Sequence, residues 1–151
     1  MFTITTNSPE QTSLLGEKIA NLIQDNLIIC LEGDLGAGKT LFTQSLCKAL
    51  KVKEIVTSPT FNLMNVYEGK KRIYHFDLYR LQDPEELELL GIRDYFNPHS
   101  IVFVEWPSRG EPLLPQADLM IDIQLHPQQG RILSLTAHNS PTIHTLNALD
   151  I

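Results

Sequence analysis

Eight consecutive residues fit the phosphate-binding pattern G-x-x-x-x-G-K-[ST]; they are Gly33, Asp34, Leu35, Gly36, Ala37, Gly38, Lys39 and Thr40. The glycines leave the backbone free to wrap an anion, because side chains there would block its approach or the positive φ angles of the turn. Lys39 can then reach the β- and γ-phosphate oxygens, and the Thr40 hydroxyl can complete the shell of a Mg²⁺ ion. The pattern predicts a nucleotide site.

The segments on either side of this loop favour that interpretation over an ordinary glycine-rich turn. The short apolar run 27–31 precedes the loop and is β-prone, and residues 41–50 follow it with apolar side chains on one helical face. The positive end of that helix would face the bound anion. Strand, glycine loop and helix therefore follow one another as phosphate binding requires.

A Mg²⁺ nucleotide site usually takes a second acid from the end of a neighbouring buried strand, and two residues qualify. Glu105 follows the continuous apolar run 101–104, which is typical of a strand buried on both faces of a parallel sheet. Asp77 ends an alternating segment and could instead pair with Arg80 or Arg72. The residues favour Glu105 and leave the role of Asp77 open.

Three further positions carry alternatives. Residues 56–60 form a polar, proline-stiffened connection, where Thr60 could belong to a switch that senses the γ-phosphate or to a plain turn. Trp106 is either a core anchor or a lid beside the phosphates. The His residues show no metal-ligand spacing, so zinc is not expected, and His75 is interpreted as a satisfied strand residue.

Local signals predict the elements that must position these residues. Ser8, Pro9 and Gln11 mark the start of a helix, with Gln11 closing a capping box, and we expect it to end near Asp25. The other expected elements are a hairpin of strands 61–67 and 72–79, a short helix 83–90 stopped by Gly91, a loop 107–115, and a C-terminal hairpin of strands 119–125 and 131–135.

Composition sets the class of protein. With 151 residues and 42% hydrophobic content, we expect a single domain over 1–151, with residues 138–151 as a loosely held tail. The net charge of -6 argues against a free-standing nucleic-acid binder. Cys30 and Cys47 are interpreted as small core residues in a reducing compartment. The N-terminal residues lack the pattern of a secretory leader, so we expect a cytoplasmic protein.

Five segments together resemble the TsaE (YjeE) family, a bacterial ATPase family that takes part in making threonylcarbamoyladenosine in tRNA. The segments occur in the family's order and spacing over about residues 8 to 135, and they read GDLGAGKT, TSPTFNLMNVY, YHFDLYRL, DPEELELLGIRDYF and VEWP. The resemblance implies an α/β fold of the P-loop NTPase type, with a mainly parallel sheet flanked by helices and a C-terminal β-hairpin. It also implies hydrolysis of ATP to ADP and phosphate.

The resemblance also assigns roles to residues. It implies that Lys39 and Thr40 serve phosphate and Mg²⁺, and that Asp77 and Glu105 belong to the metal and hydrolytic centre. Trp106 would lie beside that centre, and Thr60 would lie in the switch-like segment. Adenine would be held near three more loosely matched residues, which are Thr12, Gly130 and Arg131.

The implied partners are TsaB and TsaD, the two proteins of the threonylcarbamoyl transferase complex, with tRNA contacted indirectly. The ATPase of this family does not itself transfer the carbamoyl group. Two alternatives remain from the residues alone. One is a small-molecule kinase, which would need an acceptor pocket and an arginine-bearing lid, and the other is a nucleotide-dependent binding protein whose ATP only shapes an interface.

Overall fold

The computed structural model describes residues 2–23, 27–34, 36–57, 59, 63–96, 100–111, 113–139, 142 and 147. Seven strands form one sheet in the order β1-β7-β6-β2-β5-β4-β3. The strands are β1 (Phe2–Thr6), β2 (Ile28–Glu32), β3 (Met64–Glu68), β4 (Arg72–Asp77), β5 (Ser100–Glu105), β6 (Leu119–Leu125) and β7 (Arg131–Ala137). The helices are α1 (Pro9–Leu22), α2 (Lys39–Ala49) and α3 (Glu85–Leu90), with the 3₁₀ turns η1 (Ile92–Tyr95) and η2 (Pro107–Gly110).

The centre of the sheet is parallel and its edges are antiparallel. Strands β6, β2, β5 and β4 run parallel to one another, whereas β3 pairs antiparallel with β4 and β7 pairs antiparallel with both β6 and β1. The predicted α/β class, the first hairpin and the C-terminal hairpin are confirmed. The edge strand β1 was not predicted, and it covers the outer side of β7.

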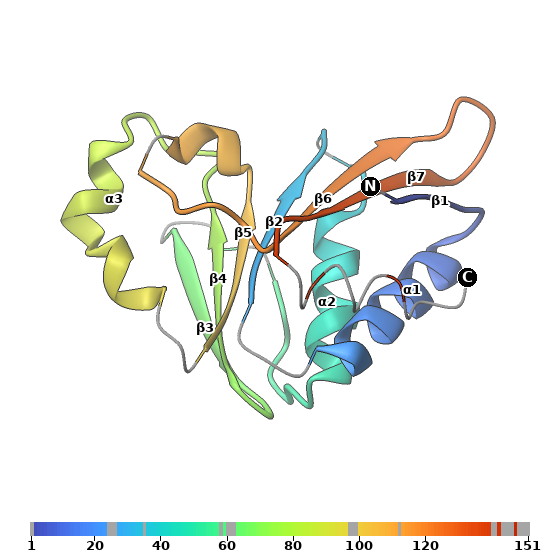
Figure 1. Ribbon diagram of the computed structural model, residues 1–151, viewed down its shortest axis with the longest axis horizontal. Helices are drawn as coiled ribbons and strands as arrows, with labels where there is room; N and C mark the ends of the chain where they lie inside the picture. Colours follow the sequence, from blue (N-terminus) through green and yellow to red (C-terminus); the bar gives the residue numbers. More distant parts are fainter. Residues whose placement is uncertain are drawn as a thin grey trace.

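Helices cover both faces of the sheet (Figure 1). Helices α1 and α2 pack on one face through a core that includes Ile19, Phe42 and Phe103. Helix α3 and the turn η1 pack on the other face through a second core that includes Phe76 and Leu87. Because side chains alternate along a strand, each central strand contributes to both cores, and this explains why β5 is buried along its whole length.

The residues that predicted the helix ends cap them as expected, with two differences from prediction. The Ser8 side chain accepts a hydrogen bond from the Gln11 N–H, as an N-cap should, but Gln11 Oε1 accepts from the Asn7 N–H rather than closing the box on Ser8. Helix α1 ends at Leu22, so the predicted end near Asp25 is wrong, and Ile23 is already extended. Helix α3 ends at Leu90, and the φ of 74° at the next residue, Gly91, fits the predicted stop.

Strand boundaries shift by a few residues from those predicted. Strand β3 begins at Met64 rather than at 61, β4 ends at Asp77 rather than at 79, and β7 continues to Ala137. Cys30 and Cys47 are buried and free, as expected of core residues. The predicted loose tail falls mostly outside the described residues. Among the helices that the structure describes, none has the length and apolar character to cross a membrane.

Candidate nucleotide site

Three parallel strands end together at one edge of the sheet, and the candidate residues follow from that register. Leu31 of β2 lies opposite Glu105 of β5, and Asp77 of β4 lies opposite Glu105 from the other side. Ligands of open α/β sheets bind at the carboxyl ends of such strands. The glycine loop leaves β2 at this same edge and enters α2 at Lys39.

The loop needs its glycines for backbone geometry. Gly33, Gly36 and Gly38 have φ angles of 148°, 80° and 108°, which L side chains rarely adopt. A Cβ atom at Gly33 would also collide with the carbonyl oxygen of Ile123 in β6. The expected reason for glycine at these positions is therefore visible in the structure, whereas Leu35 of the loop lies outside the described residues.

A pocket of about 230 Å³ lies over the start of α2, and we call it the loop pocket. Its lining joins loop residues to the ends of β4 and β5; the lining residues are Asp34, Gly36, Gly38, Lys39, Thr40, Asp77, Glu105 and Trp106. The predicted residues Lys39, Thr40, Asp77 and Glu105 are thus brought to one cavity, whereas Gly33 and Ala37 of the loop do not line it. Thr40, Asp77 and Glu105 offer the hydroxyl and carboxylate oxygens that Mg²⁺ prefers.

Lys39 is buried and folds back onto its own loop. Its ammonium donates to the carbonyl oxygen of Gly33 and, at 3.2 Å, to that of Asp34, and it lies 4.2 Å from the centroid of the Trp106 ring. Burial lowers the pKa of Lys39 from its ordinary value, although the carboxylates of Glu105 and Asp77 act in the opposite direction. A phosphate group in the loop pocket would offer this cation a fully charged partner in place of carbonyl groups.

Asp77 is half-buried at the end of β4. Its Oδ1 accepts a hydrogen bond of 3.0 Å from the Tyr79 N–H, which fixes the carboxylate at the turn that follows the strand. Burial raises the pKa of Asp77; the Tyr79 N–H opposes that rise, and the nearby Glu105 carboxylate adds to it. The suggested pairing with Arg72 is wrong, because Arg72 lies at the opposite end of β4 and pairs with Glu68 at 2.7 Å.

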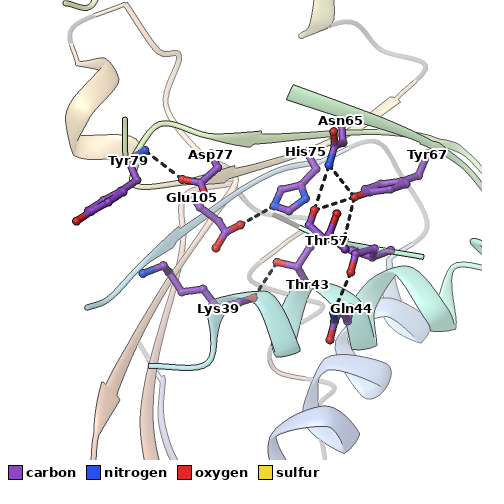
Figure 2. Close-up of polar contacts among 11 residues, drawn as sticks. Lys39, Thr43, Gln44, Thr57, Asn65, Tyr67, His75, Asp77, Tyr79 and Glu105 are labelled. Atoms are coloured by element: carbon purple, nitrogen blue, oxygen red, sulfur yellow. Dashed lines mark hydrogen bonds and ion pairs between the residues drawn. The ribbon is translucent and has the colours of Figure 1, made fainter. Parts of the chain in front are cut away.

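Glu105 is more deeply buried than Asp77, with 2% of its surface exposed. Its Oε2 lies 2.6 Å from Nε2 of His75, which is itself fully buried (Figure 2). Buried carboxylates are stable only where hydrogen bonds or charges compensate for lost hydration, and His75 supplies such a partner. The interpretation of His75 as a satisfied strand residue agrees with this contact for Nε2 but did not name Glu105 as the partner.

Trp106 adopts an unusual backbone conformation beside Glu105. Its φ of 57° places a non-glycine residue in the left-handed region, and its N–H donates to the carbonyl of Leu31 at 3.1 Å. The indole ring lies 5.0 Å from the Tyr79 ring, and the Arg109 guanidinium lies near both rings. Trp106 therefore forms a wall of the loop pocket, between the pocket and Tyr79.

The segment after α2 is tied down at Thr57. Its carbonyl accepts hydrogen bonds from the Tyr67 hydroxyl and from the Asn65 amide at 3.0 and 3.1 Å (Figure 2), and its N–H donates to the Tyr67 hydroxyl. The Gln44 side chain of α2 donates to the carbonyl of Val56. The start of the predicted switch is thereby linked to both α2 and β3. Thr60 itself lies outside the described residues.

A second pocket, of about 210 Å³, lies on the other side of Gly38, and we call it the hairpin pocket. Thr12, Gly130 and Arg131 line it together, as the predicted base site requires. The Thr12 hydroxyl, however, is hydrogen-bonded to the Thr6 hydroxyl at 2.6 Å. The Arg131 guanidinium donates to the carbonyl of Ala37 at 2.8 Å, so this side chain holds the glycine loop rather than standing free in the pocket.

Sequence reasoning missed contacts that depend on how distant segments pack. These are the pairing of His75 with Glu105, the anchoring of Thr57 by Tyr67, and the contact of Arg131 with the loop. One signal for His75 was present, because it stands two residues before Asp77 and must share its face of β4. A strand, a glycine loop and a helix, with acids at the neighbouring strand ends, define a P-loop type of α/β protein with a candidate nucleotide site.

Comparisons with known proteins agree with this class and narrow it. A sequence model of the family described as "Threonylcarbamoyl adenosine biosynthesis protein TsaE" matches residues 6–133. A relative from Haemophilus influenzae, named as tRNA threonylcarbamoyladenosine biosynthesis protein TsaE, is 42% identical over 134 residues, which cover 83% of this chain and 85% of the relative. A Bacillus subtilis protein of the same name is 38% identical over 133 residues, which cover 87% of this chain and 83% of that protein.

A solved structure is similar along nearly the whole chain. The crystal structure of YdiB from Bacillus subtilis superposes with a TM-score of 0.83 at 31% sequence identity, covering 97% of this chain and 91% of that one. The chain belongs to the TsaE family.

Proposed function

We propose that this chain is a Mg²⁺-dependent ATPase that hydrolyses ATP to ADP and phosphate in support of threonylcarbamoyladenosine formation in tRNA. Relatives at 42% and 38% identity are named for the biosynthesis of this tRNA nucleoside. The observation that carries the ATPase proposal is the loop pocket, where Lys39 and Thr40 of the glycine loop meet Asp77 and Glu105. These are the groups that phosphoryl transfer from a nucleotide needs.

Each part of the pocket has a role in the proposal. Lys39 and the N-terminal end of α2 bind the β- and γ-phosphates, because both present positive charge to the same space. Thr40, Asp77 and Glu105 would hold Mg²⁺, which when bound neutralises charge on the phosphate oxygens. Glu105 also orients the attacking water, and Trp106 closes one side of the pocket so that bulk water is excluded. The hairpin pocket receives the base.

The partners in the proposal are TsaB and TsaD of the threonylcarbamoyl transferase complex. Among the described residues that line the loop pocket there is no arginine, and ATPases often need one to stabilise the charge of the transition state. A partner that supplies charge or orders the segment after Thr57 would accelerate hydrolysis. The net charge of -6 favours an indirect contact with tRNA, through those partners in the cytoplasm.

Phosphate release tests the proposal in three mixtures: the chain alone, the chain with the two partners, and the complete mixture with tRNA. We expect slow release alone and faster release with partners. Full activity in isolation would contradict partner gating. Absence of release in all three mixtures would contradict the ATPase and favour a protein whose bound ATP only shapes an interface.

A further inference from the structure

His75 occupies a place in the fold where a polar side chain is unexpected. Side chains alternate along β4, so His75 shares a face with Ile73 and Asp77 and points toward α2. It is fully buried, and its neighbour across the strand pair is Phe103 of β5. Burying an imidazole in such surroundings is unfavourable unless its nitrogen atoms find partners.

One of the two ring nitrogens has a partner and the other has none. Nε2 lies 2.6 Å from Oε2 of Glu105, whereas Nδ1 is buried without a hydrogen-bond partner in the part of the chain that the structure describes. A carboxylate only accepts hydrogen bonds, so Nε2 carries a proton and donates a hydrogen bond to Glu105. Nδ1 is then unprotonated, so no second N–H donor is buried without an acceptor.

We propose that His75 is a positioning residue for Glu105, an inference that rests on the proposed ATPase function. The donated hydrogen bond holds Oε2, so the carboxylate keeps one orientation and its other oxygen is left on the side of Lys39 (Figure 2). The ring can hold this position because the core packs around it; Tyr67, for example, lies 6.2 Å away between ring centroids. Without this hydrogen bond, the Glu105 side chain would sample several rotamers.

Two amide variants test whether the side chain at position 75 must reach Glu105 or need only be polar. In His75→Gln the side-chain amide extends to about the place of Nε2 and can still donate to Glu105, whereas in His75→Asn it ends near the place of Nδ1 and cannot. In the mixture with partners and tRNA, we expect His75→Asn to lower kcat by about 10- to 100-fold, as for the loss of a group that orients a ligand. We expect His75→Gln to keep most of the activity and both variants to bind ATP normally.

His75→Leu tests whether the effect is only one of core packing. It fills the core with an apolar side chain but leaves the buried Glu105 carboxylate without its partner, so it should lower the melting temperature, and it should lower kcat as much as His75→Asn does. Equal kcat values in the wild type and in His75→Asn would overturn the proposal. So would equal losses in His75→Gln and His75→Asn, since reach to Glu105 would then have no effect.

A spectroscopic measurement separates this inference from the ATPase proposal. In the ¹⁵N-labelled protein, assigned with the His75→Gln spectrum, we expect a protonated Nε2 and a bare Nδ1 for His75, with a slowly exchanging Nε2–H that is lost in Glu105→Ala. The other tautomer would overturn the inference whatever the ATPase assay gives. If the expected tautomer is found but the wild type releases no phosphate, the pairing stands and the ATPase proposal fails.

Discussion

Asp77 and Glu105 lie directly opposite each other as the last residues of the neighbouring parallel strands β4 and β5. Their environments differ, because Glu105 is buried against His75 while Asp77 is half-buried and held by the Tyr79 N–H. Two acids at one strand edge, in different environments, are suited to different tasks in one reaction.

Neutral variants of these two acids should lose turnover more than affinity. We expect Glu105→Gln and Asp77→Asn each to lower kcat by about 100-fold or more, since ordering a water and holding a metal matter most in the transition state. Asp122→Asn is a matched control, because Asp122 of β6 lies opposite Glu32, the last residue of β2, but does not line the loop pocket. Phosphate release and ATP titration together measure this. A variant that loses only affinity would show a role in ground-state binding instead.

Trp106 provides an internal reporter, because the sequence contains one tryptophan. The Lys39 ammonium now lies 4.2 Å from its ring centroid. We expect Mg·ATP to draw Lys39 away toward the phosphates and so to change tryptophan fluorescence in a saturable way. Unchanged fluorescence at ATP concentrations where calorimetry shows binding would contradict this movement.

Tyr67→Phe should weaken the anchor at Thr57. The buried hydroxyl contacts both the N–H and the carbonyl of Thr57, so its removal should cost about 1 kcal/mol in the free energy of unfolding. We also expect a lower kcat, because the segment that follows Thr57 would be held less firmly. Tyr74→Phe is the control, since Tyr74 faces the other core and its hydroxyl pairs with Arg72.

Urea unfolding and phosphate release measure the two effects of Tyr67→Phe separately. If the variant is less stable but keeps the kcat of the wild type, the contact with Thr57 is structural and the predicted switch does not depend on it.

The elements at the site were predictable because their signals are local. The apolar run before Glu105 is buried on both faces, and buried runs of that kind form the centre of parallel sheets. The positive φ angles at Gly33 and Gly38 were foreseen from the loop pattern alone. Strand β1 was missed because it is a short and mostly exposed edge strand, and its stability comes from pairing with β7.

The side-chain contacts were less predictable because they depend on packing between segments far apart in the chain. His75 and Glu105 are separated by 30 residues, and Arg131 reaches a loop carbonyl 94 residues away. The strand register and the rotamers decide such contacts, and neither can be read from the spacing of residues within one segment.

The two cysteines should be unreactive in the folded protein. Burial raises the pKa of Cys30 and of Cys47 from 9.0 to about 12, so neither forms the reactive thiolate near neutral pH. We expect no alkylation by iodoacetamide at about pH 8 in buffer and modification of both in urea, measured by mass spectrometry. Modification of either thiol in the folded state would contradict this burial.

The same pKa shifts make the free energy of unfolding depend on pH. The folded state keeps the thiols protonated above the point where the unfolded chain releases those protons. Their contribution is therefore complete below about pH 9 and is lost as pH rises from 9.0 toward 12. Urea unfolding across that range measures it.

The central claim is that the glycine loop binds the phosphates of ATP, and calorimetric titration with Mg·ATP tests it most directly. The wild type, Lys39→Ala and Lys48→Ala form the set, because Lys48 is an exposed lysine at the far end of the same helix. Thermal unfolding checks that each variant is folded. We predict one ATP bound per chain in the wild type and in Lys48→Ala, and loss of binding in Lys39→Ala. Binding of Mg·ATP by folded Lys39→Ala with the affinity of the wild type would contradict the claim.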